Sequence, residues 1–239
     1  MVTNQLEIKP HKTTNIYGNN REFFKYLLKK FSPYVTTRHE KKQFVERLEK
    51  HIGHEYERNY LDCGMYNLEA VLDVIGNPRG RRILEIGCGA IPSDCKDSPG
   101  SGEYDLWLCK TLYALGANIA GIDICNMGTQ DFETQRLNVL NGFAPVFEPG
   151  SFDASFTSKF WHSPTLYSSS YYVHNKRECQ KKVYQDIHQV LKAGGVHVDD
   201  DIENYSYGGL DLTNEDFEHM GFVVEKEYRN EVVIRKNAS

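Results

Sequence analysis

A short glycine-containing segment and one carboxylate have the residue types and spacing to hold a nucleotide-like ligand. Residues 81–90 read RRILEIGCGA, an apolar run typical of a buried strand that breaks into Gly87 and Gly89. Glycines at such a break let the backbone approach a ligand closely, because no Cβ is in the way. Asp123 ends the next apolar run, where a carboxylate can accept both ribose hydroxyls of an adenosine group. Taken together, the two features predict an adenosine site, although either alone is also explained by a turn or a cap.

A parallel sheet is needed to bring these residues together. From residue 81 on, short apolar runs alternate with amphipathic segments, which is the pattern of repeated β-α units. The expected strands are 82–87, 118–123, 136–140, 152–158 and 195–199, followed by a closing pair at 222–227 and 231–235. The closing pair is expected to be antiparallel because its turn is so short. Two helices between the strands are marked by Leu108, Leu112 and Leu115, and by Val183, Ile187, Val190 and Leu191.

The first 80 residues have a different pattern. Residues 1–20 are polar and show no period, so we expect an extended arm. Helices are expected at 21–32, 40–53 and 62–75, with the last one stopped by Gly76-Asn77-Pro78. We therefore divide the chain into an N-terminal arm with a helical extension, residues 1–80, and a ligand-binding domain, residues 81–239.

The order of these motifs resembles that of the class I S-adenosylmethionine-dependent methyltransferases. The resemblance covers residues 82–236 and includes FDASFTSKFWH at 152–162 and the Gly194-Gly195 turn in LKAGGVHV. It implies an α/β, Rossmann-like fold with a mostly parallel seven-stranded sheet, an antiparallel final strand and an N-terminal helical extension. The implied activity is the transfer of a methyl group from S-adenosyl-L-methionine to a small organic molecule.

The resemblance also assigns cofactor-binding roles to the glycine loop. Glu85 would interact through the loop with the methionine end of the cofactor, and Gly87, Cys88 and Gly89 would lie against it. Asp123 would hold the ribose.

Residues after the third strand would bind the adenine ring. Asn138 or Asn141 would accept a hydrogen bond from the adenine amino group, and Val139 would be the apolar neighbour of the ring. An ordinary turn role for either Asn is an open alternative. Ile124 and Ser158 complete the implied set of cofactor-binding residues.

The segment after the fourth strand is where this family exposes residues to the transferred methyl group. It reads SKFWHSP and lacks the Asn/Asp-Pro-Pro-aromatic motif of enzymes that methylate base or amide nitrogens. His162 is the candidate general base, because an imidazole with a near-neutral pKa can take up the released proton. A capping or core role beside Trp161 is the alternative. Tyr167, Tyr171 and Tyr172 are candidates for binding an organic substrate.

No metal site is expected. The six cysteines form no CxxC pair and have no neighbouring His at ligand spacing, so we interpret them as reduced thiols. Asp199, Asp200 and Asp201 follow the fifth strand and can bind Mg²⁺ or a basic substrate. No matching acid ends the fourth strand, and a solvated loop is the expectation here.

The loop after Gly89 departs from the family pattern. Ile91 and Pro92 stand where a third glycine is usual, and the segment 93–105 lengthens the connection to the next helix. That segment is either a flap over the cofactor or a surface loop.

Composition limits the partners. The formal net charge is -5 and the basic residues form no concentrated footprint, so we expect no nucleic-acid partner. We find neither a membrane-length apolar run nor a leader pattern, and we expect a cytoplasmic protein with no membrane partner. By analogy with the family, the N-terminal helices are a candidate lid or homodimer contact.

Two other functions remain open. A nicotinamide-dependent oxidoreductase would use the same glycines and Asp123, but its third glycine would fall at Pro92, which has no amide hydrogen for a pyrophosphate. The second alternative is a non-catalytic S-adenosylmethionine-binding protein, or a methyltransferase acting on a protein partner.

Overall fold

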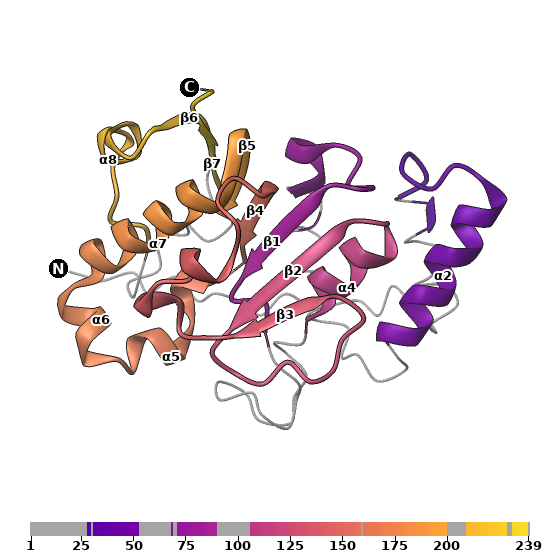
Figure 1. Cartoon of the computed structure of the whole chain (residues 1–239), viewed down its shortest axis with the longest axis horizontal. Coiled ribbons are helices and arrows are strands. Elements are labelled where there is room, and N and C mark those ends of the chain that lie inside the picture. The colour runs from indigo at the N-terminus through magenta and orange to yellow at the C-terminus, as the bar shows by residue number, and fades with distance from the viewer. Residues whose placement is uncertain are drawn as a thin grey trace, which may run out of the picture.

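The computed structural model describes residues 28–29, 31–52, 68, 71–89, 106–158, 160–199, 209–228 and 231–238. One seven-stranded sheet lies at the centre, with helices on both of its faces (Figure 1). The expected α/β architecture is confirmed.

The sheet has the strand order β3-β2-β1-β4-β5-β7-β6. Its strands are β1 (Arg82–Ile86), β2 (Asn118–Asp123), β3 (Glu133–Arg136), β4 (Phe152–Thr157), β5 (Leu191–Asp199), β6 (Phe222–Tyr228) and β7 (Glu231–Lys236). Strands β1 to β5 pair in parallel, whereas β7 is antiparallel to both β5 and β6. The predicted antiparallel final strand is therefore confirmed.

The prediction of a strand at 136–140 was wrong. The third strand is Glu133–Arg136, a polar segment at the edge of the sheet. The residues after it form the 3₁₀ helix η2 (Val139–Asn141), in which the Asn138 side chain accepts a hydrogen bond of 3.0 Å from the Leu140 amide. An edge strand does not need an apolar face, so the third strand could not be recognised from apolar residues. The apolar residues at 136–140 instead belong to the segment that packs against helix α7.

The helices are α2 (Arg38–Ile52), α4 (Trp107–Ala114), α5 (Pro164–Tyr167), α6 (Ser170–His174), α7 (Lys176–Val190) and α8 (Asn214–His219), with 3₁₀ helices η2, η3 (Ala144–Val146) and η4 (Phe160–His162). The expected helix at 40–53 corresponds to α2. Of the expected helices at 21–32 and 62–75, the described residues 28–29, 68 and 71–75 are helical. As predicted, Gly76 ends the latter: its φ is +67° and its amide donates to the Leu72 carbonyl.

Two hydrophobic clusters cover the two faces of the sheet. The first joins Phe44 of α2 and Leu112 of α4 to Ile83 and Ile119 of the sheet. Arg47 of α2 also donates to the Tyr113 carbonyl and lies over the Tyr113 ring. Described parts of the N-terminal region thus pack against the sheet domain, and the domain boundary at residue 80 stays a prediction.

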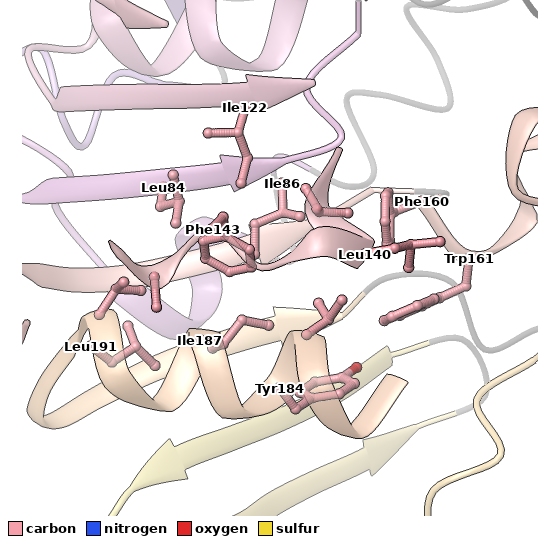
Figure 2. Close-up of a cluster of buried hydrophobic side chains, with 14 of the residues drawn as sticks. Leu84, Ile86, Ile122, Leu140, Phe143, Phe160, Trp161, Tyr184, Ile187 and Leu191 are labelled. Carbon is pink, nitrogen blue, oxygen red and sulfur yellow. The ribbon is translucent and has the colours of Figure 1, made fainter. Parts of the chain in front are cut away.

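The second cluster lies between the sheet and α7 (Figure 2). It includes Ile86 and Ile122 from the ends of β1 and β2, together with Tyr184 and Ile187 of α7. Trp161 closes it on the side where the glycine loop leaves the sheet. This cluster therefore links the sheet to the segment that follows β4.

The two glycines of the LKAGGVHV segment lie in a bulge of β5. Phe152 pairs with Leu191 and Ala154 with Val196, so β5 carries extra residues between these two pairs. Gly194 has a φ of +72°, and a Cβ on Gly195 would lie 2.9 Å from the Lys192 carbonyl oxygen. The expected Gly-Gly turn thus connects α7 to the straight part of β5.

Candidate functional site

The glycine loop is hydrogen-bonded to the end of β2. The amides of Gly87 and Cys88 both donate to the Ile122 carbonyl, at 2.8 and 3.1 Å. Gly87 and Gly89 have φ values of +73° and +94°, which a residue with a side chain rarely adopts. The loop therefore depends on glycine for its backbone conformation.

Gly87 is also required by its neighbour from the segment after β4. A Cβ on residue 87 would lie 2.6 Å from Phe160 Cδ2, well inside van der Waals contact. Phe160, at the start of η4, is buried. The loop after β1 and the segment after β4 are thus packed directly on each other.

Asp123 joins the glycine loop to the turn after β2. Its Oδ2 accepts a hydrogen bond of 3.0 Å from the Gly89 amide, and its Oδ1 accepts one of 2.8 Å from the Cys125 amide. Burial raises the pKa of the Asp123 carboxyl, and the backbone hydrogen bonds oppose this shift. The structure thus brings together the two features from which the sequence predicted an adenosine site.

Glu85 lies deeper, on the strand beneath the loop. It is buried, and its Oε2 has no hydrogen-bond partner. Burial raises the pKa of the Glu85 carboxyl to about 8; hydrogen bonding with Cys109 lowers it, and the charge of Asp123 raises it further. In the absence of a ligand, Glu85 is therefore mostly protonated at neutral pH.

Three sulfur-containing side chains pack behind the loop. The Cys88 Sγ lies 3.3 Å from the Met127 Sδ, and a Cβ on Gly121 would lie 2.8 Å from Cys88 Sγ and 3.1 Å from Cys109 Sγ. Burial raises the pKa of the Cys88 thiol to about 11. Among the described cysteines, Cys88, Cys109 and Cys179 are free thiols.

The segment after β3 places the adenine candidates at the same edge of the sheet. Asn138 is half-buried and caps η2, Val139 is buried, and Asn141 is exposed. Ile124 follows Asp123 and is half-buried. Because β1, β2 and β3 are parallel, the segments that follow them all leave from their carboxyl ends.

The candidate residues that follow β4 differ in how far their side chains are exposed. Ser158, a candidate for cofactor binding, is half-buried. Of the substrate-binding candidates, Tyr167 is half-buried, Tyr171 is 64% exposed and Tyr172 is fully buried. His162 is the last residue of η4, and its side chain lies outside the described part of the structure. The substrate-binding and catalytic assignments of these residues stay predictions.

A buried hydrogen-bond network at the ends of β4 and β5 was not predicted from the sequence. Asp199, expected in a solvated loop, is fully buried as the last residue of β5, so that expectation was wrong. Its Oδ2 accepts hydrogen bonds from the Trp161 indole, at 2.6 Å, and from the Tyr184 hydroxyl. Residues 90–105, which include Ile91, Pro92 and the insertion, and residues 200–208 lie outside the described residues.

The strand order β3-β2-β1-β4-β5-β7-β6, with β7 antiparallel, decides the fold. The chain has the class I methyltransferase fold. In this fold the strand order reverses between β1 and β4, and here the loops after those two strands meet at Gly87 and Phe160.

No known protein family and no curated protein matches the sequence. Among solved structures, the chain is similar to magnesium protoporphyrin IX methyltransferase from Synechocystis PCC 6803, with 12% identity, a TM-score of 0.47 and coverage of 94% of this chain and 100% of that one. An S-adenosylmethionine-dependent methyltransferase from Mesorhizobium loti has 14% identity, a TM-score of 0.46 and coverage of 73% and 98%. A 1,6-didemethyltoxoflavin-N1-methyltransferase from Burkholderia thailandensis has 13% identity, a TM-score of 0.46 and coverage of 72% and 78%.

Among the described helices, none is both long and apolar enough to span a bilayer.

Proposed function

We propose that this chain is an S-adenosylmethionine-dependent methyltransferase that acts on a small organic molecule. The observation that carries the proposal is the hydrogen bond from the Gly89 amide to Asp123. It joins the glycine loop after β1 to the carboxylate at the end of β2, at the carboxyl ends of the strands, where α/β proteins bind ligands. Generic turns would not need this link between two strands.

The residues of this edge suit the cofactor. A carboxylate has roughly four lone-pair sites, so Asp123 can accept the two backbone amides and ribose hydroxyls together. The glycine loop would offer backbone to the methionine end, and Asn138 and Val139 would bind the adenine ring. The carboxylate of Asp123 would favour a ligand that carries positive charge, and a cation bound beside Glu85 would lower the pKa of that buried carboxyl and ionise it.

When bound, the cofactor would supply an electrophilic methyl group on a positively charged sulfonium, from which a neutral thioether is a good leaving group. The contribution of the chain is then mainly to hold the acceptor in line with the methyl group. We assign this role to the segment after β4, because Phe160 packs it against the glycine loop. His162 would take the proton from an acceptor that loses one. Tyr167 and Tyr171 would form the acceptor side of the site, and the buried Tyr172 would support them by packing on Tyr167.

Calorimetry with S-adenosylmethionine, S-adenosylhomocysteine and NAD tests the cofactor. We expect both sulfur-containing ligands to bind and NAD not to bind. Binding of NAD but of neither sulfur-containing ligand would contradict the proposal and favour a nicotinamide-dependent oxidoreductase.

Turnover needs a separate experiment. The protein is incubated with S-adenosylmethionine and cell extract that has been split into small-molecule and protein fractions, and S-adenosylhomocysteine is measured. The proposal predicts product with the small-molecule fraction. Product with the protein fraction alone would favour a protein-directed enzyme, and cofactor binding with no product in either would favour the non-catalytic alternative.

A further inference from the structure

Asp199 is a buried carboxylate at the edge of the sheet that carries the candidate site. It is the last residue of β5 and pairs in register with Thr157, the last residue of β4. Both residues are fully buried. A buried charge is costly unless donors contact it, and the Oδ2 of Asp199 accepts from both the Trp161 indole and the Tyr184 hydroxyl.

The two donors come from different elements. Tyr184 lies on α7, which covers one face of the sheet, and Trp161 lies on η4 (Figure 2). The indole ring stacks on Tyr184 at 6.0 Å and on Tyr172 at 6.4 Å between ring centroids, with interplanar angles of 23° and 13°. The orientation of Trp161 is therefore set by stacked rings and by a charge-assisted hydrogen bond.

Trp161 is the donor whose neighbour in the chain contacts the glycine loop. Trp161 adjoins Phe160, and the two rings meet edge to face at 4.8 Å. Phe160 in turn fills the space beside Gly87. Contacts therefore run from Asp199 through Trp161 and Phe160 to the glycine loop, whereas Tyr184 supports Asp199 from α7.

We propose that Asp199 is a positioning residue: it anchors η4 through the Trp161 indole and so keeps Phe160 against the glycine loop. This inference rests on the proposed function for its meaning, since the loop is the proposed cofactor site and η4 carries His162. The loop's geometry, however, can be measured without any ligand.

The chemistry of the network suits an anchor. Burial and the negative charge of Asp199 raise the pKa of the Tyr184 hydroxyl, so this group keeps its proton and remains a donor. An indole N–H does not titrate in this range either. Both groups therefore remain hydrogen-bond donors to Asp199.

The test compares Trp161→Phe with Tyr184→Phe. Each variant keeps an aromatic ring and removes one donor to Asp199, so both should lower stability, but only the first breaks the path to the loop. Trp161→Phe should speed amide hydrogen exchange at Gly87–Gly89 when this is measured without ligand. It should also weaken S-adenosylmethionine binding about tenfold, the size of effect expected for one charge-assisted hydrogen bond. Tyr184→Phe should leave loop exchange and affinity within about twofold of the unmodified protein.

Equal effects in the two variants, or no change at the loop in either, would overturn the inference. If Trp161→Phe does not fold, Phe160→Leu replaces it, because this variant removes the ring beside Gly87 while Asp199 keeps both donors. Faster exchange at the loop in Phe160→Leu is expected, and unchanged exchange contradicts the proposed path. Failure of the unmodified protein to bind S-adenosylmethionine would remove the proposed function, while the exchange comparison would still decide the role of Asp199.

Discussion

Gly87 and Phe160 lie so close together that residue 87 has no room for a side chain. A Cβ there would lie 2.6 Å from Phe160 Cδ2, and the φ of Gly87 is +73°. Two separate requirements therefore select glycine, one from the backbone and one from a residue that the sequence places far away.

These two requirements can be separated by a double-mutant cycle. Gly87→Ala should cost about 1–2 kcal/mol for the backbone and about 1–3 kcal/mol more for the overlap with Phe160. In a Phe160→Ala background, the second part should vanish, and urea unfolding measures the difference.

Gly80 supplies the control for this cycle. Its φ is +72°, nearly that of Gly87, but nothing lies within 4 Å of its Cβ position. Gly80→Ala should therefore show the backbone cost alone, and the same cost in both backgrounds. Additive effects of Gly87→Ala and Phe160→Ala would mean that the overlap is relieved at no cost.

Asp123→Ala should weaken S-adenosylmethionine binding by about 1–3 kcal/mol, because a charged acceptor for the ribose hydroxyls is lost. Asp153→Ala is the matched control: Asp153 also accepts a backbone amide, that of Arg82, but at the opposite edge of the sheet. Calorimetry on both variants decides the matter. Unchanged affinity in Asp123→Ala, or the same loss in both, would contradict the assigned role.

Glu85 should make the protein less stable as the pH rises from about 4.5 to about 8. Its pKa is raised to about 8 in the fold, so across this window the unfolded chain gives up the proton and the folded one keeps it. At one pKa unit per 1.4 kcal/mol, the cost at pH 7 is on the order of 3 kcal/mol. Glu85→Gln should remove this component of the pH dependence in urea titrations, and an unchanged slope would show that Glu85 is ionised in the fold.

His197 should make the protein less stable as the pH falls below about 6.5. Burial lowers its pKa to about 3, while its Nδ1 lies 2.9 Å from the Ser155 hydroxyl oxygen. Stability present above pH 6.5 should be lost as the pH falls toward 3, since the unfolded chain takes up the proton first. The loss at pH 4 is on the order of 3 kcal/mol. In His197→Asn, the difference between unfolding at pH 7 and pH 4 should shrink; an equal difference would rule His197 out as its source.

Local patterns were sufficient to predict most of the fold. β1, β2 and β4 are short buried runs, and Gly76 and Gly87 mark chain reversals that need a positive φ. Strand β3 was missed because an edge strand can be polar on both faces, so no alternation marks it. The pattern of buried residues thus predicted the central strands better than the edge.

The site was predictable only where its residues belong to local motifs. The glycine loop and Asp123 each stand at the end of an apolar run. Trp161 and Asp199, in contrast, are 38 residues apart. A run of acidic residues such as Asp199-Asp200-Asp201 also predicts a solvent-exposed loop rather than a buried side chain. Their contact exists only once β4 and β5 are paired, so no short segment contains it.

Strand β7 lies between β5 and β6, although it follows both in the sequence. During synthesis, β6 and the helix α8 that packs on it therefore have no place in the sheet until residues 231–236 have left the ribosome. Until then β5, which ends at Asp199, remains an open edge that can pair with another chain. The nascent protein therefore completes its sheet only after translation of its seventh strand, and a chaperone that covers β5 would protect it during that interval.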